Sequence, residues 1–160
     1  MQNLGKYSEG TDEASTFSYK ELNGETKSVK IDSSVNSFSS FIYKDGRTTD
    51  TASFNIENSV FANNTGTLFK FLQPKTALVI TDTIFYNNNA GTESSIVFNN
   101  STSMDELTLN RTIVKNNSGK YNINATANNI NIEDSIFDNN TSTDAGGALF
   151  GSGTLKIKNS

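Results

Sequence analysis

Short apolar runs separated by small polar residues recur along the chain, and one eleven-residue pattern of them is repeated. Each copy reads apolar-x-apolar-x-x-Ser/Thr-apolar-Phe-x-Asn-Asn, except that one copy has Val114 in place of the Phe. Four copies in phase, followed by the start of a fifth, indicate a repeat architecture. The copies begin 24, 29, 23 and 25 residues apart, at Phe54, Leu78, Leu107, Ile130 and Leu155.

Two features of the repeat favour β-strands over helices. No window shows a sustained period of 3.6 residues, and each unit divides into three short runs rich in β-branched and aromatic residues. The runs are separated by Asn, Gly, Ser and Thr, which are the residues of turns. Three strands per unit predict an all-β fold, a right-handed parallel β-helix (a solenoid) of about five to six three-strand coils of 23–29 residues.

The repeat also predicts the domain organisation. We expect an N-terminal segment with a partial coil over residues 1–28, followed by parallel β-helix repeats over 29–160. A weaker copy of the pattern begins at Val29, so the coils are predicted to start near residues 29, 54, 78, 107, 130 and 155. Because the last copy stops after six residues without a polar cap, we expect a fragment of a longer solenoid.

Stacked coils would place equivalent apolar side chains above one another in two columns. One column is Val29, Phe54, Leu78, Leu107, Ile130 and Leu155, and the other is Ile31, Ile56, Ile80, Leu109, Ile132 and Ile157. Burial of a side chain of this size contributes about 1.5–3 kcal/mol, so these positions suffice for a narrow core. The pattern leaves open whether Val60 and its equivalents or Phe61 and its equivalents point inward.

Small polar residues dominate the composition, with 23 Asn, 20 Ser and 19 Thr among 160 residues, and only 34% of the residues are hydrophobic. Such values are typical of disordered chains, but the repeat assigns the polar residues to corners, where Asn tolerates a left-handed backbone. We predict an asparagine ladder in which side-chain amides bond from coil to coil. The candidates are the pairs Asn63/Asn64, Asn87/Asn88, Asn116/Asn117 and Asn139/Asn140.

The residues that the chain lacks exclude several classes of function. It has no Cys and no His, which removes disulfides, thiolate or imidazole metal sites, and Ser–His or Cys–His catalysis. A net charge of −4 argues against nucleic acid as a partner. No apolar run reaches the length of a membrane helix, and the first six residues form no apolar signal segment. We predict no cofactor and no metal, and we assign no catalytic residue.

One corner column of charged residues is the best candidate for chemistry. Stacking places Asp82, Arg111 and Asp134 on successive rungs, so the two carboxylates lie roughly 9–10 Å apart at the usual strand spacing. That separation approaches the upper limit for an inverting glycosidase pair. Because the intervening Arg111 would keep both carboxylates ionised, we favour a surface Asp–Arg–Asp ladder and predict no enzymatic activity.

Three further features bear on binding. Aromatic residues of the third strand are expected in the core, with sugar stacking as the alternative if they are exposed: Phe41, Tyr43, Phe69, Phe71, Phe98, Tyr121 and Phe150. The longest insertion, residues 89–106, is the best candidate for a projecting contact loop. Eight Asn-x-Ser/Thr triplets, which could carry N-glycans in a secreted eukaryotic protein, begin at Asn63, Asn99, Asn100, Asn110, Asn116, Asn124, Asn139 and Asn140.

The repeats resemble those of bacterial polymorphic outer-membrane proteins and similar adhesin-like surface proteins, which are marked by F-x-x-N and G-G-A-[ILV] tetrapeptides. F-x-x-N begins here at Phe61, Phe85 and Phe137, and G-G-A-L occurs once, at residues 146–149. The resemblance covers residues 54–160 well. It implies an extracellular or cell-surface β-helix, with a pectin-lyase-like fold, that serves in adhesion and has no enzymatic activity.

We therefore hypothesise a non-catalytic structural or adhesive module that presents loops to a host surface, a neighbouring surface protein or a glycan. One alternative is a carbohydrate-active β-helix enzyme, such as a polysaccharide lyase, hydrolase or depolymerase. The other is a filament subunit that stacks end-to-end on another β-helix chain through open coils. Unpaired carboxylates beside exposed aromatic residues would favour the enzyme, whereas a salt-bridged face would disfavour it.

Overall fold

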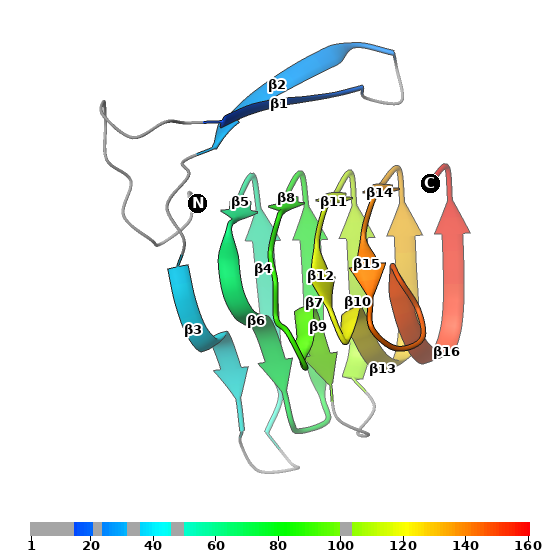
Figure 1. The fold of residues 1–160 in the computed structure, drawn as a ribbon. Coiled ribbons are helices and arrows are strands. Elements are labelled where there is room, and N and C mark those ends of the chain that lie inside the picture. The colour runs from blue at the N-terminus through cyan, green and yellow to red at the C-terminus, as the bar shows by residue number, and fades with distance from the viewer. Residues whose placement is uncertain (1–14, 21–23, 32–35, 46–49, 100–103) are drawn as a thin grey trace.

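The computed structural model describes residues 15–20, 24–31, 36–45, 50–99 and 104–160. These residues form strands and turns without a helix, and parallel sheets stack into a β-solenoid of about five turns (Figure 1). The predicted all-β parallel β-helix is therefore confirmed.

The strands of successive coils stack into three faces. The first face contains β4 (Ala52–Glu57), β7 (Thr76–Thr81), β10 (Met104–Asn110) and the second halves of β13 (Tyr121–Glu133) and β16 (Leu149–Lys158). The second contains β5 (Val60–Ala62), β8 (Ile84–Tyr86), β11 (Ile113–Lys115) and β14 (Ile136–Asp138). The third contains β3 (Asn36–Lys44), β6 (Asn64–Phe71), β9 (Ser94–Asn99) and the first halves of β13 and β16. Two short strands, β12 (Ser118–Gly119) and β15 (Thr141–Ser142), pair beside the third face.

The first face carries the two predicted apolar columns. They run in register, without a break, from Phe54 and Ile56 on β4 to Leu155 and Ile157 on β16. Every second residue of these strands faces the core, as the pleat requires. The column members on β7 and β10 are fully buried: Leu78, Ile80, Leu107 and Leu109.

The prediction that Val29 and Ile31 form the first rung of these columns is wrong. They lie in β2 (Thr26–Ile31), which pairs antiparallel with β1 (Ser15–Lys20). This hairpin is a sheet of its own, and Figure 1 draws it apart from the coils. Antiparallel strands need only a short connection, so local pairing competes well with stacking on a coil. The 29–35 copy also lacks the Phe and the paired Asn that build the corner in the later copies.

The second face settles which column points inward. Phe61, Phe85 and Val114 are buried in the main core, and the rings of Phe61 and Phe85 stack with their centroids 5.3 Å apart. Val60 and its equivalents on β8, β11 and β14 lie on the opposite side of the strands, where they form a separate apolar cluster. The Phe of the repeat is thus a core residue.

The asparagine ladder is confirmed, and it is double. The second Asn of each pair points inward: Nδ2 of Asn64 donates to Oδ1 of Asn88 at 2.7 Å, and the same bond repeats from Asn88 to Asn117 and from Asn117 to Asn140. The first Asn of each pair points outward, and Asn87 donates to Asn63 at 2.7 Å. The inner ladder fixes the corner between the second and third faces.

Left-handed backbone at two corners explains the choice of residues there. The first Asn of each pair has a positive φ of 50–56°, which Asn adopts more readily than most residues. The corner after the first face has the same conformation, occupied by Asn58, Asp82, Arg111, Asp134 and Asn159. The Ser or Thr that follows this corner donates its hydroxyl to a carbonyl two residues earlier, as Ser59 does to Glu57 at 2.8 Å. Each repeated polar residue therefore satisfies a backbone group that the turn frees.

Candidate functional site

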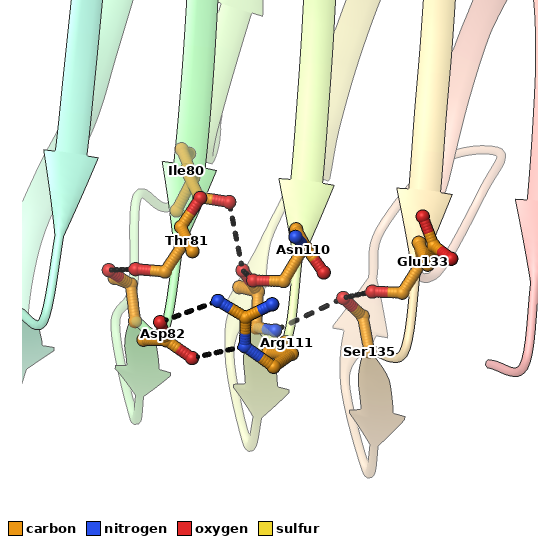
Figure 2. A network of polar contacts seen from close by, with 9 residues as sticks. Ile80, Thr81, Asp82, Asn110, Arg111, Glu133 and Ser135 are labelled. Atoms are coloured by element: carbon orange, nitrogen blue, oxygen red, sulfur yellow. Dashed lines mark hydrogen bonds and ion pairs between the residues drawn. The ribbon is translucent and has the colours of Figure 1, made fainter.

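The predicted charged column lies at the corner after the first face, and the structure brings two of its three members together. Arg111 forms a bidentate ion pair with Asp82, with Nε to Oδ1 at 2.6 Å and Nη2 to Oδ2 at 2.8 Å (Figure 2). Asp134 accepts no hydrogen bond from Arg111 and instead accepts one from Asn159 at 3.0 Å. The Asp–Arg half of the predicted ladder is confirmed, whereas Asp134 pairs with the next coil.

The ion pair decides what Asp82 can do chemically. The Arg111 guanidinium, mainly through its hydrogen bonds, lowers the pKa of Asp82 below its ordinary value of 3.8. Asp82 in turn raises the pKa of Arg111, with smaller contributions from the charges of Asp134 and Glu133. A general acid in a glycosidase needs the opposite shift, because it must hold a proton near neutral pH. Asp82 is therefore suited to an ion pair and not to proton donation.

Other carboxylates on the outside are also paired. Lys158 binds Glu133, whose carboxylate raises the lysine's pKa, and Lys115 binds Asp138. Within the described ranges no cluster of three or more carboxylates could hold a metal ion. Each of these two ion pairs joins side chains of neighbouring coils.

The predicted contact loop is corrected by the structure. Residues 89–106 do not project as one loop, because they contain β9, whose Ser94–Val97 stretch is buried, and the start of β10. The strand pairs with β6 on one side and β13 on the other. The 29-residue spacing thus includes an ordinary third strand, which its Ile-Val-Phe run indicates.

The third face divides the seven candidate aromatic residues into two sets. Phe69 and Phe71 are fully buried, and Phe41 packs against the same core. The others lie on or beside an outward column that reads, rung by rung, Tyr43, Lys70, Phe98, Asn124 and Phe150. Tyr121 joins it because its ring stacks on Phe150, with centroids 4.7 Å apart and an angle of 17°. We call these six residues the aromatic strip.

Exposure separates the strip from the core. Tyr43 is 53% exposed and Phe150 is 43% exposed, whereas Phe98 and Tyr121 are half-buried. The next column along the same strands contains Phe69, Val97 and Ile123, all fully buried. Alternation across the pleat separates Lys70 from Phe69 and Phe71. It would not have separated Phe41 from Tyr43, because these residues are two positions apart on β3 and yet belong to different sets.

The two lysines on and beside the strip, Lys70 and Lys120, each form an ion pair with a carboxylate. Lys70 lies 5.1 Å from the centroid of the Phe98 ring and 3.7 Å from the carboxylate of Glu93. Lys120 lies 5.4 Å from the Tyr121 ring centroid and 3.6 Å from Asp144.

Asp144 is the most strongly held acid of this surface. It accepts hydrogen bonds from the Ala145 backbone N–H at 2.9 Å and from the Tyr121 hydroxyl at 3.1 Å. These bonds, the backbone one first, lower the pKa of Asp144 and keep it ionised beside Lys120. The Tyr121 ring is thereby fixed from its hydroxyl end as well as by its stacking on Phe150.

The Asn-x-Ser/Thr sites differ in what a glycan would meet. Asn99 is buried and donates to the Phe71 carbonyl at 3.3 Å, and Asn140 belongs to the inner ladder. Attachment at either would require opening the coil. Asn63, Asn116 and Asn139 belong to the outer ladder, and Asn124 lies on the strip. Asn100 is outside the described residues.

Comparisons with family models, curated proteins and solved structures found no match to this chain. Among the described residues no helix is long and apolar enough to cross a membrane. The functional argument therefore rests on the surfaces of the solenoid itself.

Proposed function

We propose that this chain is a non-catalytic module of an extracellular or cell-surface protein, and that the outside of its third face attaches to a surface partner. One observation carries the proposal: Tyr43 and Phe150 are 53% and 43% exposed at the two ends of an outward column, whereas the neighbouring inward column is fully buried at its middle rungs, Phe69, Val97 and Ile123. Burial favours aromatic side chains by a few kcal/mol, so a purely structural coil has no use for rings on the outside. Aromatic side chains are enriched at interaction surfaces, where they supply most of the apolar contact area.

The scaffold suits a binding face because it holds side chains at a fixed spacing. Strands of one face are locked at about 4.8 Å by backbone bonds, and the inner asparagine ladder links four coils with amide bonds of 2.7–3.0 Å. A preorganised surface loses little conformational entropy on binding. The resemblance of the repeats to those of adhesin-like surface proteins supports the same function and the extracellular location.

Paired carboxylates weigh against the enzyme alternative. A lyase or hydrolase on a β-helix needs an acid or base that is free to exchange protons. The one predicted carboxylate pair is occupied by Arg111 at Asp82 and by Asn159 at Asp134. Beside the strip, the carboxylates of Glu93 and Asp144 are held by lysines, and that of Asp45 accepts a hydrogen bond from the Tyr43 hydroxyl at 3.2 Å.

Attachment of coated beads to cells tests the proposal. Beads that carry the folded chain are expected to bind saturably to at least one surface in a panel of bacterial and animal cells, and free chain should displace them. Beads that carry the heat-unfolded chain are the control. Equal attachment of folded-chain and albumin-coated beads to every cell type would refute the function. Release of reducing ends or unsaturated sugars from a polysaccharide panel would instead support the enzyme.

Self-assembly is a second candidate, favoured by a different observation. Leu155 and Ile157 on β16 are 48% and 58% exposed, although the same two columns are buried in the middle coils. β16 pairs with β13 alone among the described strands, which leaves its other edge able to accept a strand.

A further inference from the structure

The aromatic strip has a regular order along the solenoid axis. Its column is continuous in register across five coils, from Tyr43 through Lys70, Phe98 and Asn124 to Phe150. Aromatic rings therefore stand on the first, third and fifth rungs, and a polar side chain, Lys70 or Asn124, stands on each rung between them. At the strand spacing of about 4.8 Å, successive rings are roughly 10 Å apart.

This spacing fits a polymer that runs along the axis, perpendicular to the strands. An extended chain of β-linked pyranose sugars advances by about one strand spacing per sugar residue. Every second sugar would then lie against an aromatic ring, which is an apolar surface for the C–H face of the sugar. Lys70 and Asn124 would meet the hydroxyls of the intervening sugars as hydrogen-bond partners. Among the described residues, the Asn124 side chain makes no hydrogen bond, so its amide is available.

Charge on the strip selects among polymers. The two cations beside the rings are neutralised by carboxylates, Lys70 by Glu93 and Lys120 by Asp144. Asp45 adds a negative charge at the Tyr43 end, where it accepts a hydrogen bond from the tyrosine hydroxyl at 3.2 Å. An acidic polysaccharide or a nucleic acid would need cations without such partners. A neutral ligand has no such requirement.

A protein partner fits this surface less well than a glycan does. The cores of protein interfaces are contiguous apolar patches with few charges. Here the rings on the column are separated by a polar rung each time, and two ion pairs, Lys70–Glu93 and Lys120–Asp144, lie among them. Because the strip is a single column in which aromatic and polar residues alternate, it suits one extended glycan chain.

We propose that the aromatic strip binds an extended, neutral, β-linked glycan that lies along the solenoid axis. This assignment rests on the adhesive function proposed above and names its ligand. Tyr43 and Phe98 form two of the stacking platforms, and the stacked pair Tyr121 and Phe150 forms the third. A glycan must span five rungs to touch all three platforms.

Calorimetry with soluble oligosaccharides tests the assignment. We expect the chain to bind neutral β-1,4-linked glucose or N-acetylglucosamine oligomers, with affinity that rises from the disaccharide to about the hexamer and then levels off. Tyr43→Ser and Phe150→Ser are each expected to weaken binding of the hexamer roughly tenfold, since each removes one stacking contact. Both side chains are exposed, so the variants should keep the circular dichroism and melting temperature of the parent. Val79→Ser, an outward apolar position on the first face, is the matched control and should leave binding unchanged.

Several outcomes would overturn the assignment. One is that neither neutral oligomer series binds. Another is that the two aromatic variants bind the hexamer as tightly as the parent does. The third is that the chain binds oligogalacturonate or heparin more tightly than the neutral oligomers. Bead attachment separates this result from the proposed function. Beads that still attach to cells, but are neither displaced by the hexamer nor weakened by Phe150→Ser, would remove the glycan and leave adhesion standing. Beads that fail to attach while the hexamer binds would remove adhesion and leave the site.

Discussion

At the scale of single residues, Asn has two structural roles in this molecule, and the two adjacent Asn residues of each pair divide them. The outer Asn of each pair supplies a left-handed backbone, with φ of 53° at Asn87, and its exposed amide bonds a neighbouring coil. The inner Asn has no exposed surface, as at Asn88, and its amide satisfies buried groups on both sides. One amino acid type is used twice because a small amide is compatible with both demands.

Replacement of Asn88 by Ala is expected to cost about 3–5 kcal/mol in the free energy of unfolding. Its amide donates to Asn117 Oδ1 at 2.8 Å and to the Phe61 carbonyl at 3.0 Å. It also accepts from the side chain and backbone of Asn64. Alanine would leave these buried partners without hydrogen bonds. Urea denaturation followed by circular dichroism measures the loss.

Asn87→Gly is the matched control for Asn88→Ala. Glycine keeps the left-handed backbone and removes only the exposed amide bond to Asn63, so the expected cost is about 1 kcal/mol or less. Equal destabilisation by the two variants would show that the ladder is unimportant and that only the corner backbone matters.

At the scale of elements, the third face is the irregular side of the coil, and glycine is what allows its strands to approach. Gly66 on β6 has φ of 115°, and a Cβ built there would lie 1.7 Å from the carbonyl oxygen of Phe38 on β3. The strands shift register at this point, between Ser37 and Ser40. Gly153 on β16 is equivalent: its φ is 129°, a Cβ built there would lie 1.7 Å from the carbonyl oxygen of Ala127, and the strands again shift register nearby.

Gly66→Ala is expected to destabilise the solenoid by roughly 2–4 kcal/mol, because the methyl group would collide with backbone that cannot move without breaking the ladder of β3 and β6. Gly91→Ala is the control, since Gly91 also has a positive φ, of 60°, but has open space around its added Cβ. It should cost about 1 kcal/mol. Thermal unfolding of both variants checks the difference, and similar shifts in Tm would contradict the steric argument.

The sequence predicted three strands in each coil, but it did not define the inward and outward sides of the third strand. An eleven-residue repeat, with its apolar columns and Asn pairs, sufficed for the first and second faces because side-chain periodicity and corner chemistry agree there. The antiparallel pairing of Val29 was missed because a short apolar-x-apolar run fits either kind of strand. The aromatic residues of the third strand were expected in the core, with sugar stacking as the alternative if exposed, and Tyr43 and Phe150 are exposed. The pattern could not assign Tyr43, because it lies two residues from the inward Phe41 on β3, where regular alternation would put both on the same side.

At the scale of the whole molecule, one end of the described solenoid is a surface that resembles its interior. The last coil exposes Leu155 and Ile157, and the open edge of β16 adds unpaired backbone groups beside them. Solenoids normally cover such an end with a polar cap or with another coil.

We therefore expect the chain to associate reversibly as its concentration rises, and we expect Leu155→Lys with Ile157→Lys to abolish that association, since inward-pointing charges block strand addition. Sedimentation velocity over a wide range of concentrations measures the effect. Lys156→Ala, an outward position on the same strand, is the control and should associate as the parent does. A parent chain that stays monomeric at every concentration would contradict the expectation.

The distance between the first strand and the outer Asn has a consequence for how such a chain can change in length. From Phe54 to Asn63, Leu78 to Asn87, Leu107 to Asn116 and Ile130 to Asn139 the step is nine residues each time. All variation in spacing falls after the Asn pair, because the inner ladder bonds each of these coils to the next at a fixed position, and outer Asn residues add bonds from Asn87 to Asn63 and from Asn139 to Asn116. An insertion within the nine residues would therefore break both ladders at once, whereas one after them only reshapes a turn. Such a protein can evolve by adding or losing whole coils, and it can vary its outline freely on one side only.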